Sequence, residues 1–205
     1  MSHGKIFQMM DNITALNFLS TAINHVTKHY MEWTNLRGKL ELLVERSFAY
    51  ELYHQLRLLI DRYNAISNHP ILFIHGEISK KWYKKEERVF PDIVIHGDPS
   101  SKENQIMVCE IKRKNALTKK AIYEDLEALC ISKDEFHFNL AVFIAVGIIE
   151  ADLKSKLQES ISEWKDKANY MDTAKKICVI SYGKEDGKNY QLRKFKIGDL
   201  FKDPR

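Results

Sequence analysis

Three charged residues in the middle of the chain have the types and the spacing of a catalytic centre. Asp92 follows Pro91, and Glu110 and Lys112 flank Ile111. Carboxylate oxygens are hard ligands that suit Mg²⁺. A bound divalent ion can lower the pKa of a water molecule and neutralise a phosphate oxygen. An ammonium group beside it can help to activate that water or stabilise charge on a phosphoryl group. The three residues therefore predict metal-assisted hydrolysis of a phosphate ester.

Two predicted strands must position these residues. The runs 90–96 and 105–112 are rich in strand-forming residues, and the segment 97–101 (Gly-Asp-Pro-Ser-Ser) between them is strong turn chemistry, so we expect an antiparallel hairpin. Side chains alternate along a strand. One face of the second strand should therefore carry Ile106, Val108, Glu110 and Lys112. The hairpin would bring Asp92 close to Glu110, because each lies toward the strand end remote from the turn.

Hydrophobic periodicity predicts a mixed α/β domain with a helical N-terminus. The apolar stretch Asn139–Ile149 is typical of a strand buried on both faces. Asp11 or Asn12 is expected to cap the first helix, Gly38 to follow its end, and Thr118 to cap a later one. The expected helices cover 11–35, 39–63, a stretch after Thr118, and 153–164. The expected strands cover 71–78, 90–96, 105–112, 139–149, 177–181 and 191–197.

Pro91-Asp92, followed eighteen residues after the aspartate by Glu110-Ile111-Lys112, resembles the PD-(D/E)xK nuclease superfamily. That superfamily has the restriction-endonuclease-like fold, with a helix before the β-meander and another directly after the ExK strand. The resemblance covers approximately residues 39–180. It implies a central mixed β-sheet flanked by helices in a nuclease-like domain at 39–205, with residues 1–38 as an N-terminal helical extension. It also implies a nuclease, of endo or exo mode, that uses Mg²⁺, with Mn²⁺ as a substitute.

Members of this superfamily often supply one more acidic residue from the preceding helix. Glu41, Glu45 and Glu51 are the candidates here. At 100° per residue Glu45 falls inside the apolar stripe, where a carboxylate is costly unless it has a partner, so we expect Glu45 to assist. The resemblance then implies a metal site formed by Asp92, Glu110, Glu45 and Ile111, with Lys112 positioning or activating the water. Further polar contributions could come from Glu77, Lys119, Lys120 or Tyr123.

Basic residues follow the proposed centre and predict contact with a phosphate backbone, most naturally of DNA. They are Arg113, Lys114, Lys119 and Lys120. The segment 80–85 interleaves lysines, among them Lys81 and Lys84, with Trp82 and Tyr83. It fits either a nucleic-acid clamp with base stacking or a solvated loop whose aromatic side chains pack locally. Cleavage of both strands of a duplex would favour a homodimer with two-fold symmetry.

Composition excludes several classes of protein. Hydrophobic residues make up 44% of the 205-residue chain and charged residues 29%, as in an ordinary globular domain. The longest apolar run, 140–149, is too short to span a bilayer, so we expect no membrane association. A net charge of +4 permits a polyanionic partner without requiring one. Three cysteines without a CxxC pair favour a reducing, cytoplasmic setting over a disulfide framework or a zinc site.

Other enzyme classes lack their motifs. The sequence contains no GxSxG, GxxxxGK[ST] or GxGxxG pattern, which leaves serine hydrolases, NTPases and dinucleotide-binding enzymes without support. Two alternatives to the nuclease stay open. One is a catalytically inactive nuclease-fold module that binds nucleic acid or a protein partner. The other is an α/β interaction domain in which the motif is accidental.

Overall fold

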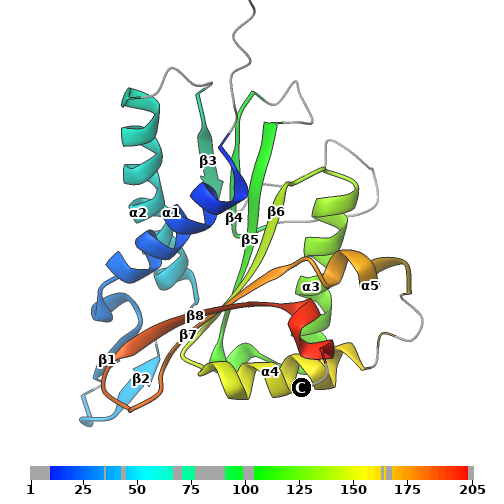
Figure 1. Cartoon of the computed structure of the whole chain (residues 1–205). Coiled ribbons are helices and arrows are strands. Elements are labelled where there is room, and N and C mark those ends of the chain that lie inside the picture. The colour runs from blue at the N-terminus through cyan, green and yellow to red at the C-terminus, as the bar shows by residue number, and fades with distance from the viewer. Residues whose placement is uncertain are drawn as a thin grey trace, which may run out of the picture.

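A mixed six-stranded sheet forms the centre of the molecule, with helices on both faces (Figure 1). The computed structural model describes residues 10–34, 36–42, 45–66, 71–76, 91–98, 104–162, 164 and 168–202. The strands in spatial order are β3 (Phe73–Gly76), β4 (Ile93–His96), β5 (Gln105–Arg113), β6 (Leu140–Val146), β7 (Cys178–Lys184) and β8 (Tyr190–Lys196). The prediction of a mixed α/β domain is confirmed.

Strand pairing includes the expected hairpin and adds a parallel centre. The pairs β3–β4, β4–β5 and β7–β8 are antiparallel, whereas β5–β6 and β6–β7 are parallel. The predicted hairpin of β4 and β5 is confirmed, with Ile93 opposite Cys109. The sequence predicted Ile106 on the same face as Val108 and Glu110, but it does not lie there. It lies at a register shift opposite the Ile95–His96 step and packs in the same cluster as Met107. A bulge of this kind interrupts side-chain alternation, so the regular pattern begins at Met107.

Five helices cover the sheet in the described part of the chain. On one face lie α1 (Asn12–His25) and α2 (Glu45–Ile66), and on the other α3 (Lys119–Asp134), α4 (Glu150–Ile161) and α5 (Ala168–Ala174). Each face has its own apolar cluster, and all seven residues of β6 are buried between the two. Burial on both faces explains why β6 reads as a continuous apolar run.

Side-chain caps begin two of the helices where the sequence predicted them. Asp11 accepts a hydrogen bond from the Thr14 amide at 2.7 Å, and Thr118 accepts one from the Ala121 amide at 3.1 Å. Each cap satisfies an N–H group that has no partner within its helix. The second cap begins α3 six residues after Lys112 and so sets where this helix starts beside β5.

The expected boundaries of the first two helices are wrong. α1 ends at His25 rather than near residue 35, and α2 begins at Glu45 rather than near residue 39. Between them lies a small hairpin of β1 (Glu32–Thr34) and β2 (Leu40–Leu42), with Gly38 in the left-handed region at φ 74°. Apolar spacing continues through this stretch, but spacing does not encode which segments pair. Glycine here permits a turn rather than a helix end.

The N-terminal helix belongs to the same core as the rest of the chain. Leu19 and Ile23 of α1 are fully buried in the cluster that contains α2 and β5. The domain boundary after residue 38 stays a prediction. Over the described residues, no helix has the length and apolarity needed to cross a bilayer. The three cysteines are buried free thiols.

Candidate active site

The hairpin of β4 and β5 brings Asp92 and Glu110 together as predicted. Asp92 immediately precedes β4, and its Oδ2 accepts a hydrogen bond of 2.6 Å from the Ile111 amide. Glu110, near the end of β5, is only 6% exposed. The negative charge of Asp92 is close enough to raise the pKa of Glu110. The hydrogen bond holds the two strand ends in register and keeps both carboxylates on one side of the hairpin.

Glu45 reaches the same place from the other side of the sheet. It is the first residue of α2, where the helix dipole favours a negative charge. Its Oε2 accepts a hydrogen bond of 3.2 Å from the Arg113 amide, and its Oε1 lies 3.8 Å from Lys112 Nζ. The expectation that Glu45 finds a partner is confirmed. Glu51, another candidate, instead accepts a hydrogen bond from Gln55 on the same helix.

A residue that the sequence analysis did not select completes the cluster. Asp125 of α3 places Oδ2 3.2 Å from Lys112 Nζ. This contact is an ion pair, and the Asp125 oxygen that makes it is buried. A signal was present, because at 100° per residue Asp125 lies only about 40° from Leu129 on the apolar side of the helix. The same argument had selected Glu45.

Three α3 residues were proposed as further polar contributors to the site, and each contacts another partner. Lys119 forms an ion pair of 2.8 Å with Glu159 on α4, and Lys120 lies 3.7 Å from Glu124 on its own helix. The Tyr123 ring packs edge-on against Trp164, with 5.6 Å between ring centroids. It is Asp125 of α3 that forms an ion pair with Lys112.

Burial and mutual repulsion dominate the electrostatics of the carboxylates. Burial raises the pKa of Glu110 well above its usual value, and the charges of Asp92 and Asp125 raise it further. Burial also raises the pKa of Asp125, to about 7, although Lys112 opposes this shift. Four carboxylates therefore surround a single ammonium group. Carboxyl groups with strongly shifted pKa values are common at functional sites.

Lys112 is the one cation within this cluster of described side chains. Its side chain is 19% exposed. Burial alone would lower the pKa of Lys112, but the charges of Asp125 and Glu45 outweigh burial and raise it. The side chain is therefore an ammonium ion at neutral pH. An ammonium ion can orient a water molecule or stabilise a developing negative charge, but it cannot accept a proton.

The donor atoms suit a magnesium ion only as a partial ligand set. No three His, Cys, Asp or Glu side chains among the described residues are grouped closely enough to hold a metal by themselves. Mg²⁺ usually takes one or two protein carboxylates and completes its shell with waters and substrate phosphates. Asp92 and Glu110 are two such carboxylates, and Ile111 can offer only its main-chain carbonyl. Burial first and neighbouring carboxylates second raise the pKa of Glu110, and a bound cation would offset the charge of those carboxylates.

An open cleft leads to the cluster. It has a volume of about 850 Å³, and its lining includes Glu45, Arg46, Tyr50, Tyr53, His75 and Asp92. Ligand-binding clefts usually measure a few hundred to a thousand cubic ångströms. The two carboxylates in its lining, Glu45 and Asp92, belong to the cluster around Lys112. A molecule bound in the cleft would therefore contact these charged residues directly.

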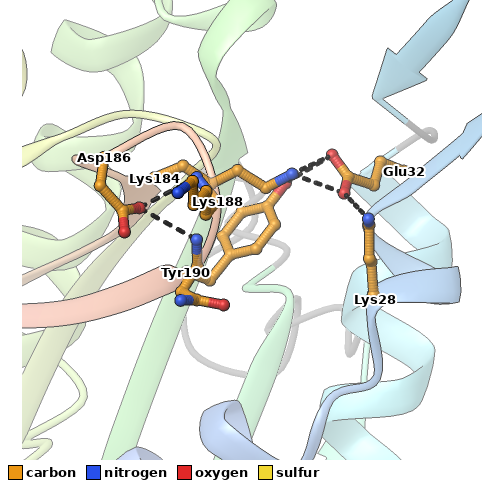
Figure 2. Close-up of polar contacts among 7 residues, drawn as sticks. Lys28, Glu32, Lys184, Asp186, Lys188 and Tyr190 are labelled. Atoms are coloured by element: carbon orange, nitrogen blue, oxygen red, sulfur yellow. Dashed lines mark hydrogen bonds and ion pairs between the residues drawn. The ribbon is translucent and has the colours of Figure 1, made fainter.

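A second, smaller cleft of about 400 Å³ lies beyond the end of β5. Its lining includes Lys114, Asp152, Glu32 and Lys184. Figure 2 shows the network at its side, in which Lys184 Nζ contacts both Glu32 oxygens at 2.6 and 2.9 Å and Lys28 contacts one at 3.2 Å. This network joins β1 to β7. Glu32 and Lys184 are 152 residues apart, so no local pattern could have predicted their pairing.

The predicted nucleic-acid contacts have varied surroundings. Arg113 is half-buried at the end of β5, whereas Lys114 is exposed beside the second cleft. Three further candidates lie outside the described residues, namely Glu77, Lys81 and Lys84, as does the rest of segment 80–85.

Comparison with known proteins adds no relative: no family model, curated protein or solved structure matches the chain.

Proposed function

We propose that this protein is a Mg²⁺-dependent endonuclease that hydrolyses phosphodiester bonds in DNA, built on a restriction-endonuclease-like core. The observation that carries the proposal is the convergence of Glu45, Asp92, Glu110 and Asp125 on Lys112 beside an open cleft. The residues come from α2, the two strands of a hairpin and α3. Glu45 and Asp125 contact Lys112 from two separate helices, which an accidental motif gives no reason to expect.

The proposed roles follow from the contacts. Asp92 and Glu110 would hold the metal, together with the main-chain carbonyl of Ile111, and the metal would supply an activated water and neutralise a phosphate oxygen. Lys112 orients the attacking water and stabilises negative charge on the phosphoryl group, since it carries a proton already. Glu45 and Asp125 hold the ammonium group from two sides. Lys114 contacts the phosphate backbone.

Cleavage of plasmid and single-stranded DNA tests the proposal. Purified protein should nick or cut these substrates with Mg²⁺ or Mn²⁺ and leave them intact in EDTA. Lys112→Ala should abolish the activity while the variant keeps its fold. Lys202→Ala is the matched control, because Lys202 is an exposed lysine near the C-terminus that forms an ion pair with Asp199 and has no part in the proposed site. Activity that persists in Lys112→Ala would contradict the assignment. Linear product from supercoiled plasmid, rather than nicked circles alone, would support a homodimer.

One observation favours a second candidate, a nuclease-fold module without catalysis. Lys112 is held in ion pairs with Asp125 and Glu45. Such pairs can lock helices to a strand without any chemistry. This module would bind nucleic acid or a protein partner through the same face. Salt-dependent DNA binding without metal-dependent cleavage on any substrate would select this candidate over the enzyme.

A further inference from the structure

The ammonium group of Lys112 and a bound metal ion would have to share the same carboxylates. Glu110 and Lys112 are two residues apart on one face of β5, which puts their Cα atoms about 7 Å apart, within reach of a lysine side chain. Burial raises the pKa of Glu110 most, and the charge of Lys112 opposes that rise. A lysine free to move at this position would therefore be drawn to the carboxylates proposed for the metal.

Asp125 lies closer to this ammonium group than Glu45 does. Asp125 Oδ2 is 3.2 Å from Lys112 Nζ, against 3.8 Å for Glu45 Oε1, and the Asp125 side chain is 14% exposed against 29% for Glu45. Burial lowers the pKa of Lys112, and the charge of Asp125 opposes burial more strongly than the charge of Glu45 does. Of these two ion pairs, the one with Asp125 is therefore the stronger.

The packing of α3 fixes the position of Asp125. Its neighbours on the buried side of the helix, Ile122, Leu126 and Leu129, belong to the apolar cluster on that face of the sheet. An aspartate side chain is short, so a fixed helix leaves its carboxylate little freedom. Glu45, by contrast, has a longer side chain and is the first residue of α2, and helix ends fray. The ammonium group is therefore held at a defined place beside α3.

The helix that carries Asp125 does not belong to the side of the sheet that forms the cleft. α3 packs on one face of the sheet and α2 on the other (Figure 1). The lining of the cleft includes Glu45 and Tyr50 of α2, together with Asp92. An ion that enters through the cleft approaches Asp92 from the side of α2, whereas Lys112 is drawn toward α3. Like charges repel, so this separation lets one cluster hold two cations.

We propose that Asp125 is a positioning residue that retains the Lys112 ammonium group beside α3 and so leaves Asp92 and Glu110 to the metal ion. Asp125 acts through Lys112 rather than on the metal. This role rests on the metal site of the proposed function, but it does not require cleavage. Without the carboxylate of Asp125, the ammonium group would move toward Asp92 and Glu110 and compete with the metal for their charges.

Metal affinity in a double-mutant cycle tests this proposal without any cleavage. Binding of Mn²⁺ is measured from the EPR signal of the free ion, in the absence of DNA, for wild type, Asp125→Asn, Lys112→Ala and the double variant. The loss of affinity caused by Asp125→Asn should be larger, by about fivefold or more, when Lys112 is present than in the Lys112→Ala background. A loss that comes only from the missing negative charge would be the same in both backgrounds.

Matched variants separate the position of the charge from folding. Asp125→Glu keeps a carboxylate beside Lys112 and should bind Mn²⁺ almost as wild type does. Glu124→Gln removes the same charge from the next position of α3, where it pairs with exposed Lys120, and should leave binding unchanged.

The outcomes distinguish this role from the nuclease itself. Equal losses from Asp125→Asn in both Lys112 backgrounds would overturn the positioning role, and metal-dependent cleavage would then leave the nuclease standing. A wild-type protein that binds no Mn²⁺ would overturn both. A loss that depends on Lys112, in a protein that cleaves no substrate, would uphold the positioning role and reject the nuclease.

Discussion

Two buried glutamates in this protein have opposite electrostatic surroundings. Burial and the charges of Asp92, Asp125 and Glu45 raise the pKa of Glu110, and the charge of Lys112 opposes this rise without cancelling it. Glu32 has Lys184, Lys28 and the Tyr190 hydroxyl around it (Figure 2). Burial alone would raise the pKa of Glu32, but the two lysines outweigh it and lower that pKa. Both side chains are almost inaccessible to water, so exposure alone does not distinguish them.

The difference separates a structural contact from a candidate reactive one. Glu32 is 3% exposed because lysine side chains cover it near the surface, and its charge is compensated. It therefore fastens the β1–β2 hairpin to β7. The charge of Glu110 is only partly compensated, because Lys112 opposes the rise in its pKa without cancelling it, and such burial of a carboxyl group costs stability. Binding of a cation would offset that cost.

The largest expected effect is on catalysis. Lys112→Ala should lower the cleavage rate at least a hundredfold, because a group that stabilises developing charge is commonly worth that factor. Lys184→Ala, which removes the corresponding lysine of the other cluster, should leave the rate per folded molecule nearly unchanged. Single-turnover cleavage assays would measure both. Equal losses in the two variants would erase the distinction between the clusters.

The same conservative substitution should change stability in opposite directions at the two glutamates. Glu32→Gln should lower the free energy of unfolding by about 2 kcal/mol, because Lys184 loses a charged partner. Glu110→Gln should raise the stability of the metal-free protein at neutral pH by about 1 kcal/mol, because it removes a crowded buried carboxyl group. Urea denaturation at pH 7 in EDTA would compare them. Destabilisation by Glu110→Gln would show that this carboxylate is compensated after all.

The pH dependence of stability should also differ between the clusters. Asp125 has a pKa of about 7 in the folded protein against a usual value of 3.8, so the folded state holds its proton more tightly. The metal-free protein should therefore lose stability as the pH rises from about 4 to 7, by an amount on the order of 1 kcal/mol or more. Asp125→Asn should flatten this profile. The lowered pKa of Glu32 acts in the opposite sense, since its contribution is present above its usual pKa and disappears in acid.

Metal binding should have the smallest and most pH-dependent effect on stability. Mg²⁺ must compete with protons for Glu110, so the rise in melting temperature on adding Mg²⁺ should be larger at pH 8 than at pH 6. Glu110→Gln should remove most of this rise, whereas Glu32→Gln should keep it. Differential scanning fluorimetry over a Mg²⁺ titration measures the effect. A rise that is the same at both pH values would argue against binding at Glu110.

Local patterns predicted the β4–β5 hairpin better than they predicted the helix ends. The hairpin of β4 and β5 was predictable because Gly97-Asp98-Pro99 marks a turn and the flanking runs are β-branched. The extent of α1 was not, since apolar spacing continues past His25 into a segment that pairs as β1. Asp125 was overlooked although its position beside an apolar stripe carried the same signal as Glu45.

The sequence by itself determined that Asp92, Glu110 and Lys112 would meet, because alternation and a two-strand turn are local constraints that act over a few residues. Only the tertiary structure decided that Asp125 and Glu45 would hold Lys112 from two helices, and that Glu32 would pair with Lys184. Those contacts join distant segments across a shared core. Their pKa shifts follow from burial and from neighbours, which exist only once the whole chain has packed.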